Sequence, residues 1–289
     1  MATVTTVWDM LAAHPTNDVR DTGYTTASDK KWAAKHPAVT TFQLYTTVDE
    51  SGVQATFDGP LEPLLTDDRL RTSTPAYPPN ERDWRLSTEA DASNWFHHEI
   101  SNVVLPGFKD YPALLQVSEA KALGDKKVDE VVDVMYTVGK ARRKQVVLVI
   151  EMKRCLIDIG HWMGGRGELE SQRKLSRELR GYALRYECPQ IICFDGSSML
   201  MLQFRANSVK DINDANCKID CWVFPRDNRG WARHLHLENG AFYYEKDGLV
   251  HTTTWENETF WQQSDVRQEQ ELAEQTMEVY DEDMSELYD

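Results

Sequence analysis

One apolar segment constrains the fold of this 289-residue chain more than any other. Residues 146–152 read Val-Val-Leu-Val-Ile-Glu-Met, and Lys153 follows directly. A run with this β-branched content is typical of a strand inside a sheet that is covered on both faces. Because side chains alternate along a strand, Glu151 and Lys153 lie on the same face at its end. We therefore expect a central strand that ends in an acid and an amine.

The segments around this strand predict an α/β fold, with a mixed central sheet flanked by helices. One helix is predicted over residues 89–104, because Ser87 or Thr88 is a good N-cap and Pro106 with Gly107 ends the pattern. A second amphipathic helix is predicted over residues 168–186. The further strands predicted for the main sheet are 114–122, 131–138, 190–194, 199–204 and 219–224, and one more strand is predicted over 39–45, before the main domain.

Three parts are expected along the chain. Residues 1–87 form an N-terminal arm and a Pro-rich connector, and residues 88–262 form the main domain. Residues 263–289 form an acidic tail. Hairpin dipeptides near the end of the main domain predict a C-terminal β-meander with strands at 235–237, 241–244 and 249–252.

Charge is distributed unevenly along the chain, whose formal net charge is -15. Asp265–Asp289 holds ten acidic residues and one basic residue, whereas Gly139–Arg185 holds twelve basic residues and five acidic ones. The negative net charge of the whole chain argues against nucleic acid as a partner, but the positive net charge of residues 139–185 favours it. Neither an apolar run of about 18 residues nor a signal-peptide pattern is found, so we expect an intracellular protein of the nucleus or cytoplasm without a membrane partner.

Three carboxylates are candidates for one site. Asp133 begins the strand before Glu151, and an antiparallel hairpin brings the two level. Two such carboxylates repel each other unless a divalent ion such as Mg²⁺ lies between them. Glu99 lies on the apolar stripe of its helix, where a charge is costly unless it is paired or binds a metal. A lysine-paired or snorkelled Glu99 is the alternative. Gln172 similarly lies near the apolar face of the later helix.

These residues, in the order helix, hairpin, helix and strand, resemble the PD-(D/E)XK nuclease superfamily. The resemblance covers about residues 88–205 and implies a restriction-endonuclease-like core. It implies phosphodiester hydrolysis in which Asp133, Glu151 and Glu99 hold one or two Mg²⁺ or Mn²⁺ ions. Lys153 would orient the attacking water and offset phosphate charge, and Gln172 would position the lysine or a phosphate oxygen.

Basic residues around this site are candidates for contacts with nucleic acid, DNA being favoured over RNA. For those on the later helix, the alternative is a solvated face. His98 is a further candidate metal ligand, and Trp162 a candidate for base stacking or for anchoring its loop. The candidate phosphate-binding residues are Arg142, Arg143, Lys144, Arg166, Arg173, Lys174 and Arg177.

Two other functions compete with an active nuclease. One is a catalytically silent module of the same fold that binds nucleic acid or a protein partner. The other is an acidic protein-interaction domain with no relation to nucleases. Because the acids and the lysine are all present, we favour the enzyme.

Overall fold

In the computed structural model of the chain, seven strands form the main sheet: β2 (Gln43–Leu44), β6 (Leu115–Ala120), β7 (Val132–Val138), β8 (Gln145–Met152), β9 (Gln190–Phe194), β10 (Ser198–Phe204) and β11 (Ile219–Pro225). Their order in the sheet is β2-β11-β10-β9-β8-β7-β6. β8 is antiparallel to β7 but parallel to β9. The predicted mixed sheet is confirmed, and the apolar strand lies inside it, between β7 and β9.

The structure describes residues 5–13, 19–21, 23–49, 52–55, 73–77, 84–108, 114–123, 130–138, 145–165, 169–226, 244–246, 249–252 and 259–262. No helix among these residues is both long and apolar enough to cross a membrane. The acidic tail lies outside them.

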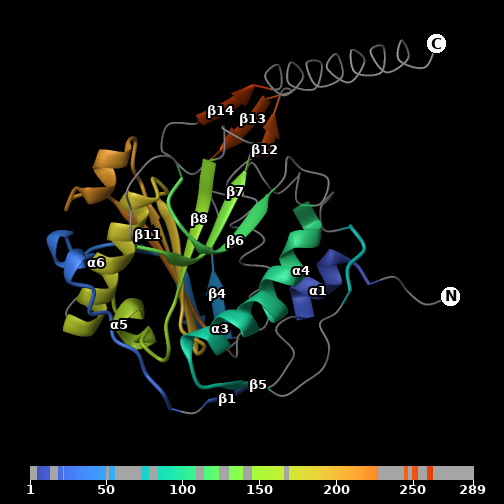
Figure 1. The fold of residues 1–289 in the computed structure, drawn as a ribbon, viewed down its shortest axis with the longest axis horizontal. Helices are drawn as coiled ribbons and strands as arrows, with labels where there is room; N and C mark the ends of the chain where they lie inside the picture. The colour runs from blue at the N-terminus through green and yellow to red at the C-terminus, as the bar shows by residue number, and fades with distance from the viewer. Residues whose placement is uncertain are drawn as a thin grey trace, which may run out of the picture.

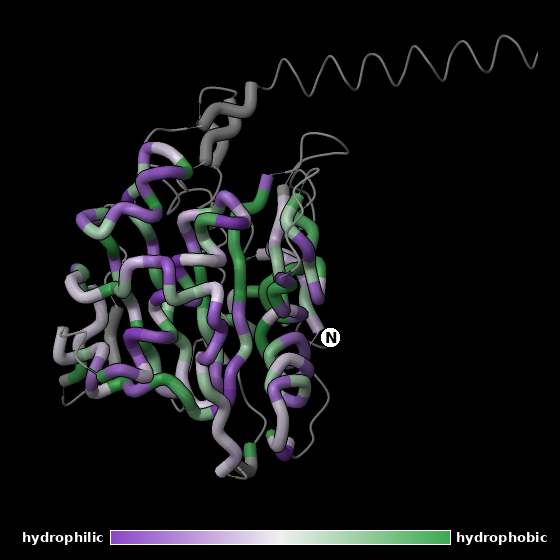
Figure 2. Tube along the Cα trace, turned by 60° about the vertical axis from the view of Figure 1, so that its left-hand side comes forward, coloured by the Kyte–Doolittle hydropathy of each residue, from purple (hydrophilic) through white to green (hydrophobic). Residues whose placement is uncertain are grey.

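Helical segments cover both faces of the sheet (Figure 1). One face carries α1 (Val7–Ala13), α3 (Glu89–Phe96), η3 (His97–Ser101), α4 (Asn102–Val104) and η4 (Leu105–Phe108), and the other carries α5 (Ile159–Met163), α6 (Glu170–Arg185), η1 (Lys31–Lys35) and η6 (Val209–Asn213). Two apolar cores result, and alternate residues of β8 enter them: Ile150 packs on the α3 side and Val149 on the α6 side. A long hydrophobic stretch accordingly runs through the middle of the molecule (Figure 2).

The predicted helix over 89–104 is present but is not a uniform α-helix. Thr88 caps it reciprocally: the Asp91 N–H donates to Thr88 Oγ1, and the Asp91 carboxylate accepts from the Thr88 N–H. The five residues of η3 then form a π-helical turn between α3 and α4. Such turns occur frequently at functional sites, and this one contains Glu99.

The predicted strand over 39–45 is wrong in extent, since β2 covers only two of its residues. The physical reason lies in α6. Val39 is buried, and its N–H donates to Ser176 Oγ at 3.0 Å, so the chain lies against the helix before it reaches β11. Side-chain packing therefore prevails over strand propensity at this position.

Three small sheets complete the described fold. β1 (Val19–Asp21) pairs in parallel with β5 (Trp84–Leu86), and β3 (Thr46–Asp49) pairs with β4 (Gly52–Ala55) as a hairpin. The predicted C-terminal meander is present as β12 (Tyr244–Lys246), β13 (Leu249–Thr252) and β14 (Thr259–Gln262). Only β13 matches a predicted strand; the one over 235–237 lies outside the described residues, as does most of 241–244.

Candidate active site

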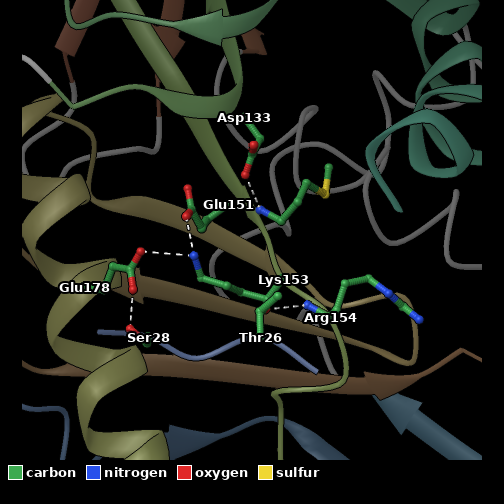
Figure 3. Close-up of polar contacts among 8 residues, drawn as sticks. Thr26, Ser28, Asp133, Glu151, Lys153, Arg154 and Glu178 are labelled. Carbon is green, nitrogen blue, oxygen red and sulfur yellow. Dashed lines mark hydrogen bonds and ion pairs between the residues drawn. The ribbon is translucent and has the colours of Figure 1, made fainter. Parts of the chain in front are cut away.

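The register of β7 and β8 places two carboxylates at one end of the sheet. Val134 pairs with Ile150 in this antiparallel ladder. One step further along, Asp133 therefore lies opposite Glu151, as the sequence predicted. Asp133 Oδ2 also accepts the Met152 N–H at 2.6 Å, which fixes the carboxylate at the strand end (Figure 3).

Lys153 lies between two carboxylates of different elements. Its Nζ is 2.5 Å from Glu151 Oε1 and 3.1 Å from Oε1 of Glu178, which projects from α6. The other oxygen of Glu178 accepts the hydroxyl of Ser28. Three distant segments thus meet at this lysine (Figure 3). We call Asp133, Glu151, Lys153 and Glu178 the ionic cluster.

The ionic cluster holds three carboxyl groups and one ammonium, and most of it is buried. Burial raises the pKa of Glu151, and the Asp133 and Glu178 carboxylates raise it further, against the effect of Lys153. Burial also raises the pKa of Asp133. Burial alone would lower the pKa of Lys153, but the two adjacent carboxylates outweigh it and the pKa rises. The cluster therefore has an excess of negative charge that a proton or a cation would relieve.

This charge excess makes a prediction for Asp133→Asn in the presence of a chelator. A carboxyl whose folded pKa is raised stabilises the fold fully below its unfolded pKa of about 3.9, and this stabilisation is lost as pH rises through the folded pKa. The amide that replaces the carboxyl does not titrate, so the variant should gain stability relative to the parent between pH 4 and pH 7. Urea denaturation across that range measures it. A relative stability that falls with pH would contradict the prediction.

Residues 26–36, which we call the N-terminal segment, lie against the end of β8 and against α6. Thr26 and Arg154 exchange two hydrogen bonds of 2.9 Å, from the Thr26 N–H to the Arg154 carbonyl and from the Arg154 N–H to Thr26 Oγ1. The buried Arg154 side chain donates to the carbonyls of Asp195 and Leu86. The two hydrogen bonds of Thr26 and the one from Ser28 hold the segment against the ionic cluster, and the side-chain contacts of Arg154 fix the backbone to which Thr26 binds.

The N-terminal segment packs closely against helix α6 at a glycine of that helix, Gly181. A Cβ atom at Gly181 would lie only 2.3 Å from Trp32 Cζ3 and 2.8 Å from His36 Cδ2. The absence of a side chain therefore allows η1 to approach the helix backbone. Trp32 then packs edge-on against Tyr182. The Arg185 guanidinium lies 3.8 Å from the centre of the Trp32 ring, in a cation–π contact.

Among the described residues, the hydrogen bonds of Gln172 do not include Lys153, so the geometry does not support the first of its two predicted roles, positioning that lysine; the second, positioning a phosphate oxygen, stays a prediction. Its amide nitrogen donates to the Leu156 carbonyl, and its oxygen accepts from the Asp158 N–H and from Trp162 Nε1. Gln172 thus anchors the segment that follows β8. Trp162 is 1 % exposed, which excludes base stacking in this arrangement and favours its alternative role as a loop anchor.

Glu99 is fully buried, as its position on the apolar stripe predicted, but it belongs to the helical layer on the other face of the sheet from α6. His98 Nδ1 lies 3.0 Å from its Oε1. Across the described residues, no three His, Cys, Asp or Glu side chains gather in a way that could hold one metal ion. The predicted set of three carboxylates with Glu99 is therefore not assembled here.

The three residues of α6 that were predicted to contact phosphates lie at its surface in ion pairs. Lys174 Nζ is 2.9 Å from Asp29 Oδ1, and Arg177 and Arg173 lie 3.4 and 3.9 Å from carboxylate oxygens of Glu170. Such exposed pairs contribute little stability and exchange readily for other anions. The other candidates for phosphate contacts, Arg142, Arg143, Lys144 and Arg166, lie outside the described residues.

Sequence reasoning missed Glu178 and Ser28. Glu178 carries a recognisable signal, because it follows Leu175 by three residues and precedes Tyr182 by four, on the buried face of α6. The same argument had identified Glu99. Ser28 carries no comparable signal, since it lies in an irregular segment 150 residues from its partner.

Comparisons of the chain with protein-family models, curated proteins and solved structures found no match. Function is therefore inferred from the geometry and chemistry of the ionic cluster.

Proposed function

We propose that the chain is a metal-dependent nuclease that hydrolyses phosphodiester bonds with Mg²⁺ or Mn²⁺, with DNA favoured over RNA. The observation that carries this proposal is the facing pair Asp133 and Glu151 with Lys153 beside them at the end of β8. The order helix, three strands, helix and strand from α3 to β9 supports a restriction-endonuclease-like core. It is the order on which the resemblance to PD-(D/E)XK nucleases rests.

The side chains present fit a hard divalent cation. Mg²⁺ binds through one or two carboxylates and leaves its other positions to water and phosphate. Asp133 and Glu151 supply two such carboxylates, and burial raises the pKa of each, so that a bound cation would favour their charged forms. Glu99 is left out of the proposed ligand set.

In this proposal the bound ion supplies Lewis-acid activation of water and charge at the phosphate oxygens. Asp133 and Glu151 hold the ion at the strand end. Lys153 orients the attacking water and offsets charge on the scissile phosphate. Glu178 keeps the ammonium in place from the α6 side, and Ser28 fixes Glu178 in turn. Ser28 and Glu178 are therefore positioning residues.

One observation favours a second function, a catalytically silent module that binds nucleic acid or a protein. Glu151 is 4 % exposed and Lys153 is 3 % exposed, so the ionic cluster is closed to a large substrate in this arrangement. In a silent module, the cluster would only join β8, α6 and the N-terminal segment. Metal dependence separates the two functions.

Metal binding should stabilise the parent protein and switch on cleavage. An ion present at ten times its Kd adds about 1.4 kcal/mol to the free energy of unfolding, which raises Tm by roughly 3–6 °C in a chain of this size. Thermal melts and cleavage assays on plasmid, single-stranded DNA and RNA, in millimolar Mn²⁺, Mg²⁺ or chelator, measure both effects. We expect cleavage only with metal.

Asp133→Asn is the matched control for this experiment, because it keeps the shape of the side chain and removes one metal ligand. It should show neither the shift in Tm nor cleavage. An unchanged Tm together with no cleavage of any substrate by the parent would refute the nuclease and leave the silent module. An equal Tm shift in the control would remove Asp133 from the metal site.

A further inference from the structure

We propose that the hollow between the N-terminal segment and α6 binds backbone phosphates of the nucleic acid strand, as a subsite beside the ionic cluster. This inference rests on the proposed function and adds to it a segment for which the sequence offered no chemical role.

The hollow has a volume of about 300 Å³ and is lined mainly by charged residues. Four of them are cations and two are anions: Lys30, Lys31, Lys174, Arg177, Asp29 and Glu170. Its volume lies at the lower end of the range for small-ligand sites and suits a phosphate group with part of its nucleotide. The excess of positive charge selects an anion.

The positive charge of the hollow is only partly compensated by its own acids. Asp29 pairs with Lys174, and Glu170 pairs with Arg177. Lys30 and Lys31 are both exposed, and neither forms an ion pair with any other residue that the structure describes. Two ammonium groups therefore remain to meet an incoming anion, and the paired Lys174 and Arg177 can exchange their partners for it.

The hollow is connected to the ionic cluster through one residue. Ser28 lines it, and its hydroxyl donates to Glu178, which contacts Lys153. Lys30 also lies near enough to Asp133 for their charges to interact. A strand whose scissile phosphate lies at Asp133 and Glu151 would therefore bring neighbouring phosphates to Lys30 and Lys31.

Lysine chemistry indicates what part of the strand is bound. An ammonium on a flexible stem is a point charge without the planar, bidentate fork of arginine. It suits phosphate oxygens, which position a strand without reading its sequence. The occupant that we infer is the phosphodiester backbone, and binding should be independent of base sequence.

The double variant Lys30→Gln/Lys31→Gln tests this inference. Labelled single-stranded DNA, duplex DNA and RNA of unrelated sequence are titrated in chelator, which prevents cleavage, at several salt concentrations. Two lost phosphate contacts should weaken binding by on the order of ten-fold and reduce the slope of log K against log salt by roughly 1.4–1.8. Both changes should be the same for different sequences.

The matched control is Lys35→Gln/Lys210→Gln, which removes the same charge from two exposed lysines that do not line the hollow. It should keep the parental affinity and slope. Equal losses in both double variants would show an effect of overall charge and overturn the subsite. A parental slope in Lys30→Gln/Lys31→Gln, or no binding of any probe by the parent, would also overturn it.

Thermal melts of the same proteins with and without Mn²⁺ distinguish a failure of the phosphate subsite from a failure of the proposed nuclease function. Lys30→Gln/Lys31→Gln retains Asp133 and Glu151, so it should keep the parental shift of Tm with Mn²⁺. If that shift is present and the binding slope is unchanged, only the subsite fails. If the shift and metal-dependent cleavage are both absent in the parent, the proposed nuclease fails as well.

Discussion

Replacing Lys153 with Met is expected to lower the free energy of unfolding by about 3–5 kcal/mol at pH 7, the usual cost of removing one partner of a buried ion pair. The Met side chain fills much of the same space, but Glu151 and Glu178 would then face each other without a cation. Both carboxylates are almost completely buried, so water cannot replace the ammonium. Urea denaturation in chelator measures the loss.

The pH dependence of this loss identifies its cause. The raised pKa of Lys153 means that its own contribution is fully present below the unfolded value of about 10.4 and is lost only well above it. Between pH 4 and pH 8, any change with pH in the free energy lost by Lys153→Met must therefore come from the titration of the carboxyl groups. The raised pKa of Glu151 lets it take up a proton as pH falls, so the loss should shrink toward pH 4.

Lys174→Met is the control, because this lysine forms an exposed pair with Asp29. Its cost should be far smaller than that of Lys153→Met, because solvent screens an exposed ion pair. A cost for Lys153→Met that is equally small, or one that does not change between pH 4 and pH 8, would show that the ionic cluster is not the source of stability inferred here.

The second large effect concerns cleavage by Glu151→Gln. On the proposed mechanism, the variant loses one of two carboxylates that hold the metal and should cleave on the order of 10²-fold or more slowly, the range for one positioned catalytic group. Gln keeps the size of the side chain and can still accept from Lys153 Nζ. Single-turnover cleavage with saturating Mn²⁺ measures the rate.

Glu187→Gln removes an exposed carboxylate just after α6, one that belongs neither to the ionic cluster nor to the lining of the hollow, and serves as the control. It should cleave at the parental rate. Parental cleavage by Glu151→Gln would exclude that carboxylate from the chemistry, whereas an equal reduction in both variants would point to a general loss of charge or fold.

The sequence predicted the site best where the spacing of apolar residues along one strand or helix determines the face on which a side chain lies. Strand alternation placed Glu151 with Lys153, and the hairpin between β7 and β8 placed Asp133 opposite them, because register follows from the apolar pattern. The burial of Glu99 followed from helix periodicity in the same way. These predictions need only residues that are close in sequence or joined by one turn.

Other parts of the site depend on contacts between separate elements, which the spacing of residues along one helix or strand does not reveal. Helix α6 buries both Gln172 and Glu178, and periodicity cannot tell which of the two lies level with the end of β8. The structure assigns Gln172 to the segment after the strand and Glu178 to Lys153. Likewise, Gly181 reads in the sequence as a weak helix position, and only the packing of Trp32 explains it.

The contact between Ser28 and Glu178 also has a consequence for how the protein is made. The two residues are 150 positions apart, so at a synthesis rate of about 5–20 residues per second the segment around Ser28 leaves the ribosome some 8–30 s before its partner. Until α6 follows, Trp32 and the nearby lysines have no helix to pack against. The ionic cluster can therefore form only once synthesis has passed residue 178, and until then the lysines near Ser28 lack the helix beside which they lie in the folded protein.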